Sequence, residues 1–163
     1  MKDQELNIRI AKIRELSDRN SINRWELMRY DGSGITVTIQ SGFHDRPARH
    51  CVSLVIGTNY NYMRGQMRHN LLSFSIEVFF DIEPFRDLDA NETGDIELPP
   101  RIMTIMYGVA VGALRGILAQ KLENTFLRDY PLPLVNISDL VSRHIYGTPP
   151  PDHTVPFVDL RYN

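Results

Sequence analysis

The histidine and carboxylate side chains are the first groups in this sequence to consider for catalysis. His44, Asp45 and His50 fall within one short segment, and His69 lies farther along the chain. A hydrolytic centre built on them would need a nucleophile held beside its base, and no G-x-S-x-G-like segment supplies one. Two of the histidines could hold a metal ion, but loop histidines at a protein surface are far commoner. The sequence therefore predicts no catalytic residue, no metal site and no cofactor.

Composition and isolated motifs narrow the function further. The glycine-rich run 108–116 lacks the lysine of a phosphate-binding loop and sits inside a helical pattern. The formal net charge is only −2, so we expect no nucleic-acid partner. Cys51 is the single cysteine, which excludes an internal disulfide and predicts a buried, inert thiol. The first twelve residues carry charges where a signal peptide needs an apolar core, so we expect a cytoplasmic protein.

Three runs of alternating apolar residues predict the elements that would position any site. Period-two alternation held over such lengths predicts an antiparallel sheet with one buried face. Residues 7–16 add a fourth strand, in which the alternation of Ile8 and Ile10 slips by one before Ile13, as at a β-bulge. The predicted buried face consists of Ile35, Val37, Ile39, Leu54, Ile56, Phe74, Ile76, Val78 and Phe80.

A long helix over residues 98–123 is predicted to cover that sheet. Pro99 and Pro100 suit its approach and first turn, where a missing N–H costs nothing. Behind them apolar residues recur at the three-and-four spacing of a buried helical stripe. The stripe consists of Ile102, Ile105, Met106, Val109, Ala113, Ile117 and Leu118.

Gly108, Gly112 and Gly116 form a smooth ridge along the same helix. Each helical glycine costs about 1 kcal/mol relative to alanine, so three on one face predict a close backbone approach. The partner is either the protein's own sheet or a second subunit, in which case the three glycines mark an oligomer interface. The stretch is also long enough to span a membrane, but a central Arg115 would cost about 2.5–3.5 kcal/mol there. We predict no membrane insertion.

The remainder of the chain completes the predicted fold. Pro131 and Pro133 exclude helix from the crossover TFLRDYPLPLVN, and Asn136 or Ser138 is expected to cap a short second helix. The fold class is therefore α+β: a four-stranded antiparallel sheet with a long helix packed on one face, a Pro-rich crossover and a short C-terminal helix. Residues 1–145 form one domain, and residues 146–163 form an extended, Pro-rich tail.

Six apolar residues lie outside the predicted core. A contiguous apolar set would mark a contact surface, unless the tails or another subunit cover it. We predict that together they bind polypeptide along one open groove. They are Tyr60, Tyr62, Phe79, Tyr130, Leu132 and Leu134.

The order of these elements, with the segment NTFLRDYPLPLVNISDL, resembles the SecB family of export chaperones. The positions that match the family pattern are Thr125, Phe126, Pro133, Val135, Asn136 and Leu140. The resemblance implies a cytosolic homotetramer, built as a dimer of dimers, that holds unfolded polypeptides in apolar grooves without nucleotide. Some family members deliver secretory precursors to the SecA motor, and relatives guard an antitoxin.

Three departures from the family pattern argue against docking to SecA. The low net charge leaves no evident acidic surface, and the C-terminal tail does not match the family's SecA-contacting tail. A segment with seven acids, residues 81–97, stands where the family has a short helix. The sequence thus predicts a SecB-like chaperone for unfolded clients. The alternatives are an adaptor or assembly domain for one folded partner and, more weakly, a hydrolase built on His44, Asp45 and His50.

Overall fold

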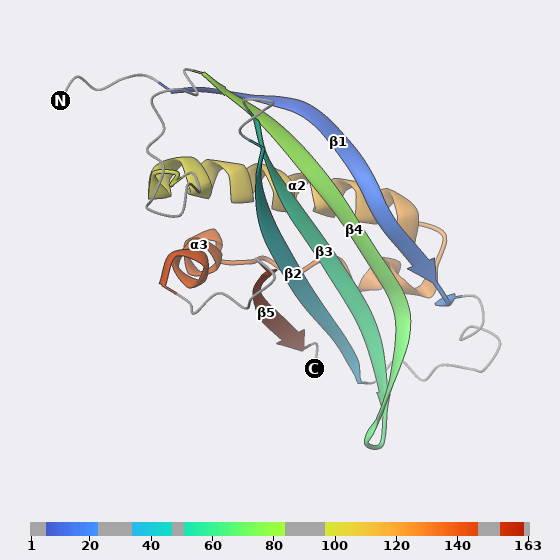
Figure 1. Cartoon of the computed structure of the whole chain (residues 1–163). Coiled ribbons are helices and arrows are strands. Elements are labelled where there is room, and N and C mark those ends of the chain that lie inside the picture. The colour runs from blue at the N-terminus through green and yellow to red at the C-terminus, as the bar shows by residue number, and fades with distance from the viewer. Residues whose placement is uncertain (1–5, 23–33, 47–50, 84–96, 147–153, 162–163) are drawn as a thin grey trace.

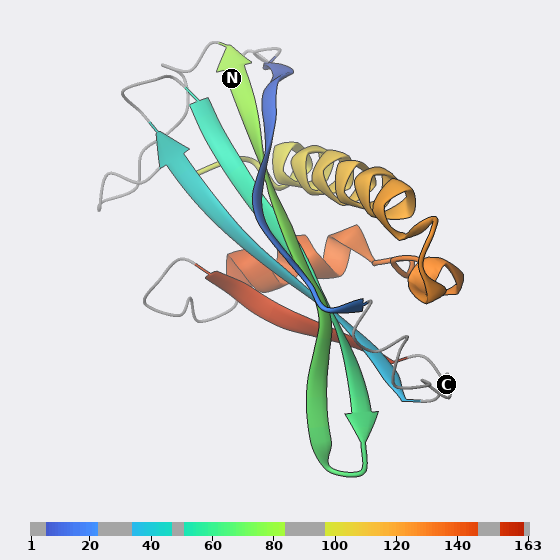
Figure 2. The same ribbon diagram turned by 90° about the vertical axis from the view of Figure 1, so that its right-hand side faces the viewer.

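A computed structural model describes residues 6–22, 34–46, 51–83, 97–146 and 154–161. Every strand pairing is antiparallel, in the order β1-β4-β3-β2-β5. The long helix α2 lies across one face of this open sheet (Figures 1 and 2). The elements are β1 (Asn7–Asn20), β2 (Ile35–Arg46), β3 (Cys51–Arg64), β4 (Met67–Glu83), α2 (Pro100–Leu122), the 3₁₀-helix η3 (Phe126–Asp129), α3 (Ile137–Tyr146) and β5 (Thr154–Arg161).

The α+β class and the four predicted strands are confirmed, and β5 adds a fifth strand to the sheet. It was not predicted because the proline-rich tail around it carries no period-two alternation long enough to indicate a strand. Strands β3 and β4 form the centre of the sheet and meet in a tight turn in which Arg64 pairs with Met67. Gly65 supplies the positive φ, +62°, that this turn requires. The hairpin projects beyond its neighbours (Figures 1 and 2).

The predicted buried face of the sheet is confirmed, since all nine of its residues are at most 2% exposed. Val52, Tyr60 and Leu72 extend the same face along β3 and β4. Each fully buried side chain of this size contributes about 1.5–3 kcal/mol through the hydrophobic effect. The opposite, outer face carries small and polar side chains, among them Ser53, Ser75 and Glu77, because successive side chains alternate across a strand.

The bulge predicted in the first strand is also confirmed. The register of β1 against β4 shifts between Ile10 and Lys12, and shifts again between Glu15 and Ser17. Each bulge inserts one unpaired residue and increases the local twist of the strand. Strand β1 therefore bends along the edge of the sheet.

Helix α2 begins as predicted, with Pro100 at its first turn and the Pro99 carbonyl accepting a hydrogen bond from the N–H of Ile102 at 2.9 Å. The predicted stripe is wrong in part, because Ile105 is exposed and Val109, Ala113 and Ile117 are only partly buried. The helix is rotated so that larger side chains enter the core, which buries more apolar surface. The buried residues are Ile102, Met103, Met106, Tyr107, Ala110, Val111, Leu114, Leu118 and Leu122.

Arg115 holds the crossover that follows α2. Its Nη2 donates to the carbonyl of Pro133 at 2.9 Å and its Nε donates to that of Leu132 at 3.4 Å. The predicted cap of the second helix is Asn136, whose Oδ1 accepts the backbone N–H of Ser138 at 3.1 Å. Within the described ranges, α2 is a helix with the length and hydropathy to cross a membrane, but 44% of its apolar stretch is buried.

Candidate functional site: an open sheet edge and an open helix face

The structure does not gather the six predicted polypeptide-binding residues into one open groove. Tyr60 and Tyr62 are buried because they continue the core-facing alternation of β3, and Leu132 is only 4% exposed. The Tyr60 hydroxyl donates to the backbone carbonyl of Tyr130 at 2.9 Å, which ties the crossover to the sheet. The expectation that the crossover lies outside the core is therefore wrong at Leu132. This part of the crossover acts as cover for the sheet.

The other members of that set lie apart from it. Leu134 is 89% exposed and points away from the core. Phe79 is half-buried on the outer face of the sheet, opposite to the helices, because its neighbours Val78 and Phe80 face the core. No single groove formed by the described residues can thus contain both Phe79 and the crossover.

The glycine ridge of α2 does not face the protein's own sheet, which was the first of the two expected partners. Gly108, Gly112 and Gly116 are exposed, and a Cβ atom built on each would meet no described atom outside its own stretch of helix within 4 Å. Ile105, at 45% exposure, continues this face toward the start of the helix. The face is smooth, and no described element of the chain covers it.

Strand β1 presents a second open surface, which sequence reasoning did not identify. It pairs with β4 on one side, and on its other side no described strand lies beside it. Its backbone offers a row of hydrogen-bonding groups over fourteen residues. Three large apolar side chains of the strand are 42–47% exposed, namely Ile10, Ile13 and Leu16. The available signal was that charged residues separate these apolar ones along the strand, as is common in an edge strand.

Ionic contacts on the outer face hold β1 to the sheet. Arg14 pairs with Glu77, a carboxylate that is only 2% exposed and that also accepts the Ser53 hydroxyl at 2.6 Å. The Arg14 guanidinium lies 5.4 Å from the centre of the Phe79 ring, which explains why an aromatic residue stands on this polar face. A buried carboxylate needs such partners, so the position of β1 and the burial of Glu77 depend on each other.

Lys121 of α2 holds β1 from the helix side. Its Nζ lies 2.9 Å from Asp18 Oδ2 and 3.4 Å from Glu15 Oε2, and 4.7 Å from the centre of the Phe74 ring. The hydrogen bond with Asp18 raises the pKa of Lys121, and Glu15 adds to that effect. The ammonium stays charged, so this link between helix and edge strand persists across the physiological pH range.

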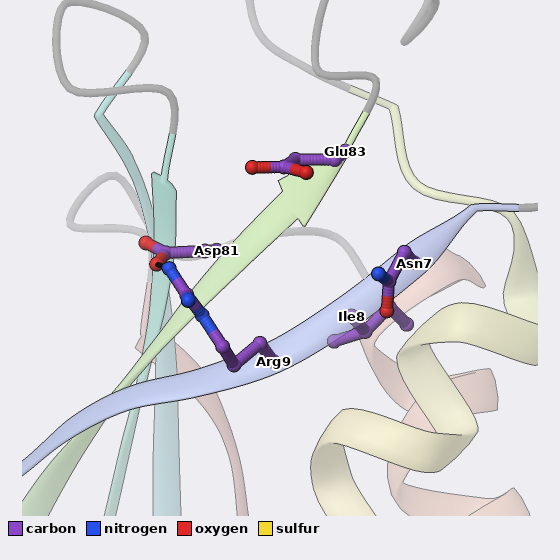
Figure 3. A pocket seen from close by; sticks show the side chains of 5 residues that line it. All are labelled: Asn7, Ile8, Arg9, Asp81 and Glu83. Carbon is purple, nitrogen blue, oxygen red and sulfur yellow. Dashed lines mark hydrogen bonds and ion pairs between the residues drawn. The ribbon is translucent and has the colours of Figure 1, made fainter.

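A shallow cavity of about 260 Å³ lies where β1 begins and β4 ends, lined by Asn7, Ile8, Arg9, Asp81 and Glu83 (Figure 3). Arg9 extends toward Asp81, and their side chains meet at 2.6 Å. This hydrogen bond raises the pKa of Arg9. None of the five lining residues is a hydroxyl, thiol or imidazole nucleophile. The Arg9–Asp81 pair at this cavity is a third attachment of β1 to the sheet.

Of the residues first considered for catalysis, the structure places two histidines on different strands. His44 is exposed near the end of β2 and His69 lies near the start of β4, whereas His50 and the Asp45 side chain lie outside the described residues. Within the described ranges, no three metal-ligating residues come together. Cys51 is buried as predicted. Most of the acidic segment 81–97 also lies outside the described residues.

Comparison with known proteins identifies no family for this chain. The chain matches no protein-family model and no curated protein sequence. The candidate site is therefore defined by its geometry: an α+β protein with a sheet edge that carries three exposed apolar side chains among charged ones, and an exposed helix face formed by glycines.

Proposed function

We propose that this protein is a SecB-like cytoplasmic chaperone that binds non-native polypeptides without nucleotide, as an export factor or as the guardian of an antitoxin-type client. The observation that supports this proposal best is the β1 edge, whose outer side no described strand pairs with and which exposes Ile10, Ile13 and Leu16. An extended chain can add to such an edge through main-chain hydrogen bonds, which are independent of sequence. The apolar side chains supply contacts that many clients can satisfy.

The same proposal includes a homotetramer built as a dimer of dimers. Two separate apolar surfaces, the β1 edge and the glycine ridge of α2, support it, because a dimer of dimers needs two different self-complementary contacts. Helix backbones approach closely where glycines replace larger side chains, so a second α2 helix fits the ridge. Clients would then bind to the part of the β1 edge that the assembly leaves open.

The second candidate is an adaptor that binds one folded protein. Leu134 favours it, since this residue is 89% exposed on a segment that Arg115 holds rigidly. A single rigid apolar anchor is typical of specific interfaces. The range of proteins bound distinguishes the two candidate functions. A chaperone protects unrelated denatured proteins from aggregation, whereas an adaptor protects none of them.

The test measures aggregation of two unrelated denatured proteins, followed by light scattering without nucleotide. We expect the wild-type protein to delay both, and Ile13→Asp to weaken the protection by about tenfold because it removes an exposed apolar side chain and places a charge there. The matched control is Ala11→Asp, which adds the same charge to the same exposed strand while removing only a methyl group.

Sedimentation of each variant separates client binding from assembly. Loss of protection by Ile13→Asp in an intact oligomer supports a client site on β1. A wild-type protein that delays neither aggregation would contradict the proposed chaperone function.

A further inference from the structure

The opposite edge of the sheet is occupied by the chain's own C-terminal strand. Strand β5 pairs antiparallel with β2, from Thr36 opposite Arg161 to Gly42 opposite Thr154, with a register shift between Ile39 and Ser41. The backbone of β2 from Thr36 to Gly42 is therefore an edge that accepts an extended segment in this geometry. Strand β5 is itself an example of an extended segment bound to this edge.

Several features set β5 apart from the four other strands. It has eight residues against twelve to seventeen in the others, and it contains Pro156, which has no N–H to donate. It joins the sheet through β2 alone and follows a sequence with three consecutive prolines, Pro149 to Pro151. Fewer ladder hydrogen bonds oppose its release than oppose the release of any other strand.

The strand beneath it is rigid. Ile35, Val37 and Ile39 of β2 are at most 2% exposed, and β2 pairs with β3 along its whole length. If β5 left, the core would keep β2 in place and a row of backbone N–H and C=O groups would become unpaired. Such a row is a template for another extended chain.

We infer that the β2 edge is a binding site for an extended segment of non-native polypeptide, and that β5 is an internal occupant which the client displaces. This inference rests on the proposed chaperone function and adds a second, gated edge to the open β1 edge. A client binds only when β5 has left, so the apparent dissociation constant rises in inverse proportion to the open fraction. The occupant also protects the edge from unspecific pairing when no client is present.

The experiment locks β5 in place in the full-length protein. Thr36→Cys and Arg161→Cys put two thiols at positions whose Cα atoms are paired across the strands, and Cys51→Ala removes the native thiol. The probe is a reduced, carboxymethylated globular protein, which stays unfolded. We expect oxidation to weaken its binding by about tenfold, and reduction to restore it, because the closed edge excludes the client. The control carries Thr36→Cys and Cys51→Ala alone and should not respond to oxidation.

Hydrogen exchange of the wild-type protein gives an independent measurement. The β2 amides that bond to β5 should exchange much faster than the amides between β3 and β4, because β5 opens without global unfolding. Equal probe binding by the locked and reduced forms, or equal protection of both amide sets, would overturn the inference and leave the chaperone proposal standing. No binding by either form would overturn both.

Discussion

The two edges of the sheet are built differently. At one edge, β1 is fourteen residues long and contributes side chains to ion pairs with β4 and α2, through Arg9, Arg14 and its two acids facing Lys121. At the other edge, β5 is eight residues long and includes a proline. Of the two edge strands, β1 is the more firmly held, and no described strand lies on its outer side. The described part of the chain thus presents one open edge at β1 and a second edge, at β2, that its own strand β5 fills.

The attachment of β1 gives the largest expected effect. Replacing Arg14 with alanine removes a charged partner of the buried Glu77 carboxylate. We expect a loss of about 3 kcal/mol in the free energy of unfolding, at the low end for buried pairs because Arg14 itself is half-exposed. Urea denaturation measures this loss. Arg19→Ala, on the same exposed strand, is the control and should change stability by less than about 0.5 kcal/mol. Equal effects of the two changes would show that the Arg14–Glu77 pair does not hold β1.

The ionisation of Tyr107 measures how firmly the core is packed beside β2, because this residue lies beneath the sheet near Ser41 of β2. Burial raises the pKa of Tyr107 to about 12, from an ordinary value of 10.0. Its contribution to stability is complete below pH 10 and is lost as the pH rises through 12, since the unfolded chain ionises first. The loss amounts to about 3 kcal/mol in total, because each pKa unit corresponds to about 1.4 kcal/mol.

Denaturation at pH 8 and pH 11.5 measures this effect, and Tyr107→Phe removes the ionisable group. We expect the variant to lose clearly less stability between the two pH values than the wild type loses. If both proteins lose the same amount of stability between these pH values, groups other than Tyr107 cause the alkaline sensitivity.

The smallest expected effect on the stability of the subunit concerns the glycine ridge of α2, which belongs to neither edge of the sheet. Gly112→Ala should raise helix stability by about 1 kcal/mol, because the added Cβ would meet no described atom outside its own stretch of helix within 4 Å. Gly112→Leu should be tolerated by the subunit fold and should dissociate the proposed oligomer. Light scattering and circular dichroism separate these effects. An oligomer that survives Gly112→Leu unchanged would assign self-association to the β1 edge instead.

Local patterns in the sequence were sufficient to predict several features of the fold. The buried face of three strands follows from period-two alternation, the bulge after Ile10 follows from a slip in that alternation, and Pro100 and Asn136 mark the starts of the two helices. These features are encoded locally because the direction of a side chain, or the absence of one N–H, depends on a few neighbouring residues.

Tertiary structure decided the rest. The sequence by itself determined that α2 has a glycine ridge, but only the packing of Tyr107 and Leu114 turned that ridge away from the sheet. It showed an apolar crossover, but only the hydrogen bonds of Arg115 and Tyr60 decided that Leu132 is buried and Leu134 is exposed. The order of strands, and with it the identity of both edges, depends on pairings between residues far apart in the chain. Local periodicity specifies which way a side chain points, whereas the partner it meets is chosen by the free energy of the whole packed core.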